Sequence, residues 1–181
     1  MKRLPLLVLL LLGSLSVNAL SVETYDFDQE KNLVKNYDFE GLGVHPWRAF
    51  SEDSSILFRV NIDQNESVTG NQSLVVEILG ENRQSEVFLA TGEFPVKKGQ
   101  IFTFSLYAKT EKSREVVISV DKNYSKVDYG WKSIFIGTDW SEFSLPVYIT
   151  EDGTAEIKIN LRDASINGKV WFDAVRFYEE Y

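Results

Sequence analysis

Apolar and polar residues alternate along most of this chain, and this pattern limits the fold more than any other feature of the sequence. In Ile101–Lys109 every second residue from Phe102 onward is apolar, and Thr103, Ser105 and Tyr107 stand between them. Successive side chains of a strand point to opposite faces of a sheet, so a period of two predicts strands with one buried face. The clear candidates are Ile56–Ile62, Ser73–Leu79, Ile101–Lys109, Arg114–Asp121, Ala155–Leu161 and Lys169–Phe177, and weaker ones are Ser85–Ala90, Trp131–Ile136 and Ser141–Tyr148.

The number and spacing of these segments predict the fold class. Turn-forming residues such as Thr69-Gly70-Asn71 and Asn167-Gly168 separate them, and no window shows a helical apolar face. Nine or ten short strands in 181 residues predict one all-β domain, a two-sheet antiparallel β-sandwich of jelly-roll type. In the last segment the alternation places Val170, Phe172 and Ala174 inside, and Trp171, Asp173, Val175 and Phe177 outside.

The first nineteen residues have the layout of a secretory signal. Lys2 and Arg3 precede the apolar run Leu4–Leu12, and small and polar residues follow up to Ala19. A run of nine residues is far below the roughly 20 needed to span a bilayer. We therefore expect residues 1–19 to be a signal peptide cleaved near Ala19, residues 20–31 to be a lead-in segment, and the protein to be secreted or periplasmic.

The composition excludes several kinds of chemistry. The chain has no cysteine and one histidine, which excludes thiolate metal sites and disulfides and argues against a histidine-based catalytic triad. Its formal net charge of -8 argues against nucleic acid as a partner, because little would neutralise the phosphates. No membrane insertion is expected either.

The start of the expected domain carries a recognisable motif. Asn32–Glu40, which reads NLVKNYDFE, resembles the opening of carbohydrate-binding modules of families 4, 9, 16 and 22. Further blocks resemble later family motifs, in the expected order: Ser67–Leu74, Val96–Ser105, Asp139–Phe143 and Val170–Val175. The resemblance implies that residues 32–181 form a galactose-binding-domain-like jelly roll that binds a polysaccharide or oligosaccharide.

The same resemblance implies a structural calcium ion that joins the N-terminal segment to the last strand. Glu40 and Asp173 stand at the matching positions, and the backbone around Asp38 and Asn71 would complete the shell of oxygens that calcium prefers. An alternative for Asp173 is that its carboxylate caps backbone amides.

Aromatic side chains that point away from the core are the candidate sugar contacts, because rings stack on the C–H faces of sugars and polar groups bind the hydroxyls. The predicted ligand-binding residues are Trp47, Arg48, Arg83, Tyr107, Asp121, Tyr129 and Trp131. Some alternatives stay open: Trp47 could plug one end of the sandwich, and Trp171 could line a cleft or cap the opposite sheet. Trp140 is expected to be structural.

These observations predict a secreted, non-catalytic module that binds a glycan of the β-glucan or xylan type in an aromatic-lined cleft. The first alternative is a cell-envelope domain for protein interaction or adhesion. The second is a small jelly-roll glycoside hydrolase, which would need two carboxylates close together. No recognisable catalytic motif surrounds the acidic residues of the predicted strands.

Overall fold

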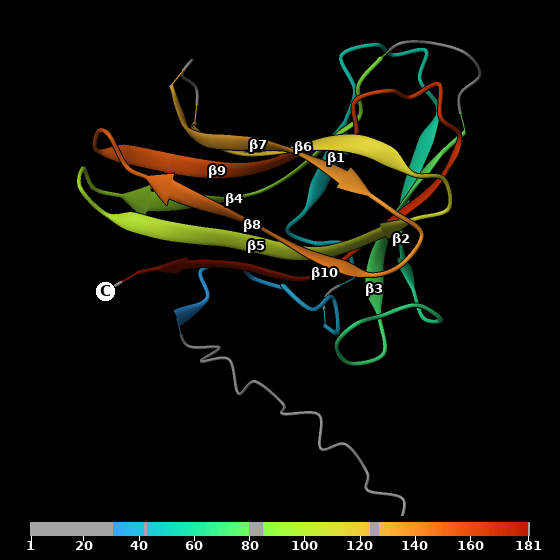
Figure 1. Cartoon of the computed structure of the whole chain (residues 1–181), viewed down its shortest axis with the longest axis horizontal. Helices are drawn as coiled ribbons and strands as arrows, with labels where there is room; N and C mark the ends of the chain where they lie inside the picture. Colours follow the sequence, from blue (N-terminus) through green and yellow to red (C-terminus); the bar gives the residue numbers. More distant parts are fainter. Residues whose placement is uncertain (1–30, 42, 80–84, 124–126, 181) are drawn as a thin grey trace, which may run out of the picture.

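The computed structural model in Figure 1 describes residues 31–41, 43–79, 85–123 and 127–180. The predicted signal peptide, nearly all of the lead-in segment and Arg83 lie outside these residues. In the described part there is no helix long and apolar enough to cross a membrane.

Within these residues ten strands form two antiparallel five-stranded sheets that pack face to face, which confirms the predicted β-sandwich (Figure 1). Sheet A has the order β1-β4-β9-β6-β7 and sheet B the order β2-β3-β10-β5-β8. The strands of sheet A are β1 (Arg48–Phe50), β4 (Phe88–Val96), β9 (Gly153–Asn160), β6 (Arg114–Lys122) and β7 (Asp128–Ile136). Those of sheet B are β2 (Phe58–Asp63), β3 (Ser73–Ile78), β10 (Gly168–Glu179), β5 (Ile101–Thr110) and β8 (Ser141–Tyr148).

The core lies between the two sheets and is built from the apolar positions of the alternation. On β5 the side chains of Phe102, Phe104, Leu106 and Ala108 are almost fully buried, as the sequence predicts. The rings of Phe102 and Phe177 stack with their centroids 4.6 Å apart. Close packing of this kind supplies most of the favourable free energy of folding in a domain without disulfides.

The last strand departs from the predicted alternation. The pairing of β10 with β5 shifts register between Asp173 and Arg176, and Ala174 has a left-handed backbone with φ of 48°. A bulge adds one residue to a strand and therefore reverses which face the later side chains occupy. Val175 and Phe177 are consequently fully buried in the core, so the prediction that they point outward was wrong.

The N-terminal segment pairs with β10 next to the bulge. Asn32 donates from Nδ2 to the Val175 carbonyl and accepts the Phe177 amide at Oδ1. The Leu33 amide donates to the Phe177 carbonyl, and the Val175 amide donates to Tyr37. The segment thus satisfies the backbone groups of β10 beyond the end of its pairing with β3. This is the structural role of the opening motif.

Candidate functional site

The outer face of sheet A carries a row of side chains that crosses all five strands. The register aligns Arg48 of β1, Ala90 of β4, Lys158 of β9, Ser119 of β6 and Trp131 of β7. Neighbouring strands lie about 4.8 Å apart, so the row is roughly 19 Å long. This is long enough for an extended ligand to lie across the strands.

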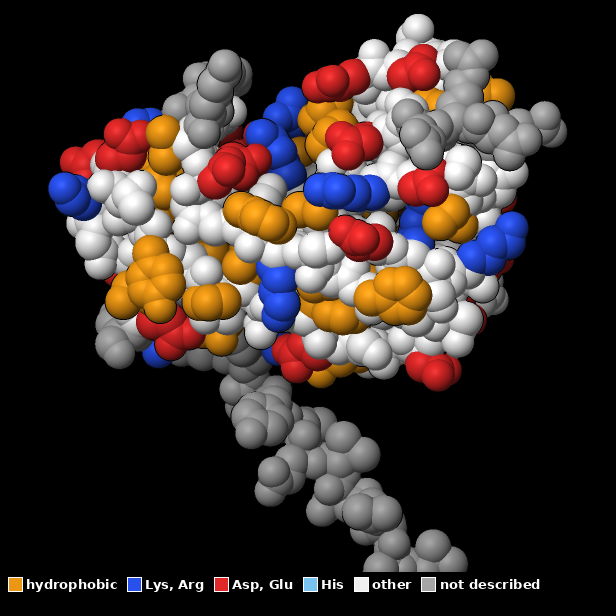
Figure 2. Space-filling model, turned by 45° about the horizontal axis from the view of Figure 1, so that its top comes forward, with side chains coloured by type: hydrophobic (Ala, Val, Ile, Leu, Met, Phe, Trp, Pro, Cys, Tyr) orange, Lys and Arg blue, Asp and Glu red, His pale blue; other side chains and the backbone are white. Residues whose placement is uncertain are grey.

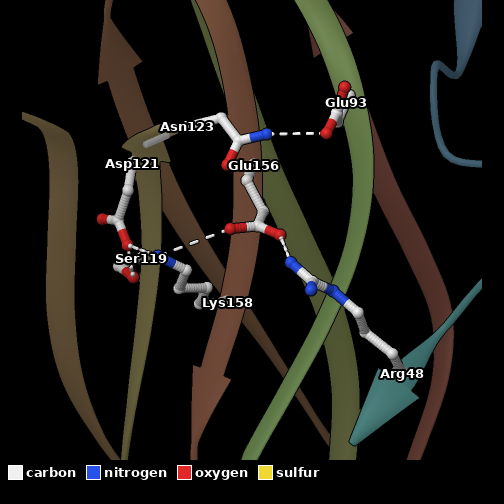
Figure 3. A network of polar contacts seen from close by, with 7 residues as sticks. All are labelled: Arg48, Glu93, Ser119, Asp121, Asn123, Glu156 and Lys158. Atoms are coloured by element: carbon white, nitrogen blue, oxygen red, sulfur yellow. Dashed lines mark hydrogen bonds and ion pairs between the residues drawn. The ribbon is translucent and has the colours of Figure 1, made fainter. Parts of the chain in front are cut away.

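Charged groups form a connected network in the middle of this face (Figure 3). Lys158 Nζ lies 3.1 Å from Asp121 Oδ2 and 3.4 Å from Glu156 Oε2, and Arg48 binds the other oxygen of Glu156. The Glu156 carboxylate is 5% exposed and the Arg48 side chain is 62% exposed. A buried carboxylate is tolerated only when cations pair with it, so Arg48 and Lys158 are needed to keep Glu156 in place.

The two shifted pKa values in the network agree with this arrangement. Burial raises the pKa of the Asp121 carboxyl above its usual value, and the hydrogen bond from Lys158 offsets only part of that effect. Burial alone would lower the pKa of Lys158, but the hydrogen bond and the charge of Asp121 outweigh burial, so the pKa of Lys158 is raised. The lysine therefore stays charged and holds both carboxylates.

A bulge in β4 adds a second polar pair at one end of the network. The pairing of β4 with β9 shifts register between Thr91 and Phe94, where Gly92 has a φ of 74°. A Cβ on Gly92 would lie 2.2 Å from the Phe94 ring, so only glycine fits. Glu93 accepts a hydrogen bond of 2.7 Å from the Asn123 side chain (Figure 3). The polar surface thus extends from β1 to the end of β6.

Aromatic rings flank the polar network on both sides. Trp131 and Phe135 on β7 are 61% and 69% exposed. At the opposite edge Phe50 and Phe88 stack, with centroids 5.3 Å apart, and the Arg48 guanidinium lies over the Phe50 ring. The space-filling view in Figure 2 shows basic and acidic side chains close together on this face, with hydrophobic side chains beside them. Exposed rings can stack on a sugar ring, and the polar groups beside them can form hydrogen bonds with its hydroxyls.

The structure brings together only some of the residues predicted to bind the ligand. Arg48, Asp121 and Trp131 share the outer face of sheet A. Tyr107 also points outward, but it lies on sheet B, where its hydroxyl donates to Glu142. It therefore cannot line the same surface as Trp131.

Trp47 and Tyr129 need a correction, because each is only 5% exposed. Trp47 packs on Phe39 in the core, which agrees with the alternative that it plugs the sandwich. Tyr129 is also part of the core and donates from its hydroxyl to the Glu151 carbonyl. Neither ring can stack on a ligand in this arrangement.

Several residues of the candidate site were not in the predicted set: Phe50, Phe88, Glu93, Asn123, Phe135, Glu156 and Lys158. Phe135 could have been found, because it stands four residues after Trp131 in the same predicted strand and therefore points to the same face. Glu156 and Lys158 also stand at the polar positions of a predicted strand. Phe50 belongs to a strand of three residues, which is too short to show a period.

The residues proposed for calcium meet at one turn, but they bind amides there. Asp173 accepts hydrogen bonds from the amides of Val68, Thr69 and Ala174, and Glu40 accepts the amides of Asn71 and Gln72 through Oε1. The oxygens of Asp173 are thus occupied as they would be in the amide-capping alternative. Asp38 Oδ1 accepts the Glu40 amide.

The chemistry of this donor set does not fit a calcium ion through Asp173. The side chain is fully buried, and burial raises the pKa of its carboxyl, which the hydrogen bonds from Thr69 and Val68 only partly offset. Within the described ranges no group of three or more acidic or histidine side chains is placed to hold a metal. An ion at this turn would have to use Glu40 and backbone carbonyls.

Comparison with solved structures places the fold among carbohydrate-binding modules and some enzymes. A CBM61 module in complex with β-1,4-galactotriose is 15% identical, with a TM-score of 0.63 over 83% of this chain and 99% of the other. The CBM22-1 xylan-binding domain of Xyn10C from Paenibacillus barcinonensis is 13% identical, with a TM-score of 0.57 over 79% and 91%. A cyclase from Fischerella sp. TAU is 12% identical, with a TM-score of 0.68 over 83% and 96%. At these identities the likeness shows the fold alone.

The sequence itself gives the family. No curated protein sequence matches the chain. A family model described as a carbohydrate binding domain, CBM_4_9, matches residues 31–165, which include nine of the ten strands and every residue of the network on sheet A. The chain therefore belongs to this family of carbohydrate-binding modules.

Proposed function

We propose that this protein is an exported, non-catalytic module that binds a polysaccharide or oligosaccharide of the β-glucan or xylan type on the outer face of sheet A. One observation carries the proposal: Trp131 and Phe135 are the exposed rings of β7, and they stand on the same face as the network of Arg48, Glu156 and Lys158. Large exposed rings beside convergent polar groups are typical of ligand sites.

The charges of this face favour a neutral glycan. Two cations, Arg48 and Lys158, are paired with two carboxylates, Glu156 and Asp121. Each cation has more N–H donors than these contacts use, and those donors are available for hydroxyl groups. A hydroxyl both donates and accepts, so it can bind a paired network without breaking it, whereas an anionic sugar would meet the two carboxylates.

The relatives support a β-linked chain as the ligand class. One similar module was solved with β-1,4-galactotriose and another is described as xylan-binding. The length of the row on sheet A suits such a chain, with Trp131 at one end and Arg48, which lies over the Phe50 ring, at the other.

The experiment that tests the proposal is affinity electrophoresis of the protein in gels that contain xylan, mixed-linkage β-glucan or galactan, together with an assay for released reducing ends. Retardation by at least one polymer without new reducing ends is the expected result. New reducing ends would support the hydrolase, for which Asp121 and Glu156 are the candidates because both contact Lys158 Nζ. No retardation together with a defined oligomer would support a protein-interaction domain.

Export and the calcium ion are part of the proposal. The basic start and apolar run of residues 1–19 support export. The amides of Asn71 and Gln72 donate to Glu40 Oε1, so an ion at this turn would bind through Glu40 Oε2 and backbone carbonyls. Anything that binds only the folded state raises its stability. Chelation with EDTA should therefore lower the melting temperature, and readdition of calcium should restore it. An unchanged melting temperature would rule out the ion and leave the amide hydrogen bonds as the sole link.

A further inference from the structure

A polar pocket lies on the outer face of sheet B, on the opposite side of the sandwich from the network on sheet A. Its volume is about 340 Å³, and it is formed by β2, by the turn after it, by β3 and by the start of β10. Its lining residues are the apolar Ile62 and Val75 and the polar Asn61, Asp63, Gln64, Asn65, Glu77 and Lys169. The register places Asn61, Val75 and Trp171 side by side on this outer face of sheet B.

The wall of this pocket is held in place before any ligand binds. Asp63 accepts a hydrogen bond of 2.8 Å from the indole nitrogen of Trp171 and one of 2.9 Å from the Asn65 amide. Burial would raise the pKa of Asp63, but the Trp171 and Asn65 hydrogen bonds outweigh it and lower that pKa. The Trp171 indole is fixed in turn by Lys109, whose ammonium lies 4.9 Å from the ring centroid. Pre-organised polar groups lose little freedom on binding.

The lining of the pocket carries two carboxylates, Asp63 and Glu77, and one cation, Lys169. Glu77 stands directly between Arg59 and Lys169 in the register, so two cations flank this carboxylate. Asp63 already accepts hydrogen bonds at both oxygens, from Trp171 and from Asn65. The side-chain amides of Asn61 and Gln64 add groups that both donate and accept. Such a lining suits a neutral compound rich in hydroxyls better than an anion or a cation.

The size of the pocket limits the ligand. A volume of about 340 Å³ is near the lower end of the roughly 300–1,000 Å³ found for small-molecule sites. It has room for one or two sugar units and not for a long chain. From these observations we propose that the outer face of sheet B carries a second carbohydrate site, which takes a terminal sugar residue and is separate from the site on sheet A.

The two sites can be observed separately by NMR, because Trp131 stands on the outer face of sheet A and the Trp171 indole donates a hydrogen bond to Asp63 in the pocket wall. We would titrate the 15N-labelled protein and its Trp131→Ala variant with methyl β-D-glucopyranoside, methyl β-D-xylopyranoside and methyl β-D-galactopyranoside, each alone. The Trp171 indole and the side-chain amides of Asn61 and Gln64 report on the pocket. The Trp131 indole of the unaltered protein reports on sheet A.

The expected result is a saturable shift of the pocket signals with at least one glycoside, in both proteins. The double variant Asn61→Ala with Gln64→Ala should bind that glycoside at least tenfold more weakly. The control Ser144→Ala, also exposed on sheet B but outside the pocket, should behave as the unaltered protein.

Pocket signals that do not move with any of the three glycosides would overturn the inference. A response that the double variant leaves unchanged would overturn it as well, because the binding would then lie elsewhere. Failure of the sheet A proposal would look different, since it would show as an unresponsive Trp131 indole when xylan or β-glucan oligosaccharides are added.

Discussion

Replacement of Trp131 by alanine tests the central interaction of the proposed glycan site. A tryptophan side chain can bury up to about 250 Å², and Trp131 is 61% exposed. Roughly 150 Å² is therefore open to a ligand, and a stacked sugar ring would cover about half of it, since it lies on one face of the indole. At about 25 cal/mol per Å² this corresponds to ~1.9 kcal/mol, or about a 25-fold rise in Kd.

The same numbers limit the damage to the fold. The remaining surface of about 100 Å² is already covered by the protein, so the free energy of unfolding should fall by at most ~2.5 kcal/mol. Isothermal titration calorimetry with the retarding polysaccharide measures the first effect, and urea unfolding measures the second.

Tyr148→Ala is the matched control. Tyr148 is 58% exposed, nearly as much as Trp131, but it belongs to β8 at the edge of sheet B. Tyr148→Ala removes an aromatic ring of similar exposure, and the Kd for the polysaccharide should not change. If Trp131→Ala binds as tightly as the unaltered protein, or if both variants lose affinity equally, stacking on sheet A is not the source of binding.

Three further substitutions test the β4 bulge, the capping carboxylate of β10 and the buried acid of β6. Gly92→Ala should cost about 1–3 kcal/mol of stability, measured by urea unfolding, because the added Cβ meets the Phe94 ring at a positive φ. Asp173→Asn should cost about 1–3 kcal/mol for each backbone amide left without an acceptor, and an unchanged midpoint would contradict the capping role. The pKa of Asp121 is raised in the folded state, so the folded protein binds this proton more tightly than the unfolded chain does. The free energy of unfolding should therefore rise as the pH falls from the folded-state pKa of Asp121 to its ordinary pKa of 3.8. Asp121→Asn should therefore remove that part of the pH dependence of the free energy of unfolding, and an identical pH profile would refute it.

Local alternation predicts the strands well where the ladder is regular. Every second residue of β5 from Phe102 to Ala108 is buried, and on β7 the exposed residues Trp131 and Phe135 stand four apart, as the period requires. The period fails where the backbone inserts a residue. In β10 the positive φ of Ala174 carries the bulge, and nothing in the sequence of that strand marks an alanine as the residue that adopts it.

Alternation also says which residues face outward without saying from which sheet. Tyr107 on β5 and Trp131 on β7 are both outward, yet they lie on opposite faces of the sandwich because β5 belongs to sheet B and β7 to sheet A. The assignment of a strand to a sheet depends on hydrogen bonds between segments far apart in the chain. The sequence predicts the orientation of each residue within its strand. Only the pairing of β6 with β7 and β9 brings Asp121 to Lys158 and onto the same face as Trp131.

The burial of Glu156 depends on the way the strands of sheet A are paired. An isolated glutamate at an outward strand position would be expected in solvent, but this residue is 4% exposed. Its carboxylate can be buried only because β1 brings Arg48 to one oxygen and β9 itself brings Lys158 to the other. The short edge strand β1 therefore places two side chains of the site: Arg48 next to Glu156, and Phe50 against Phe88. The polar centre and one aromatic edge of the site thus depend on the same three residues of chain.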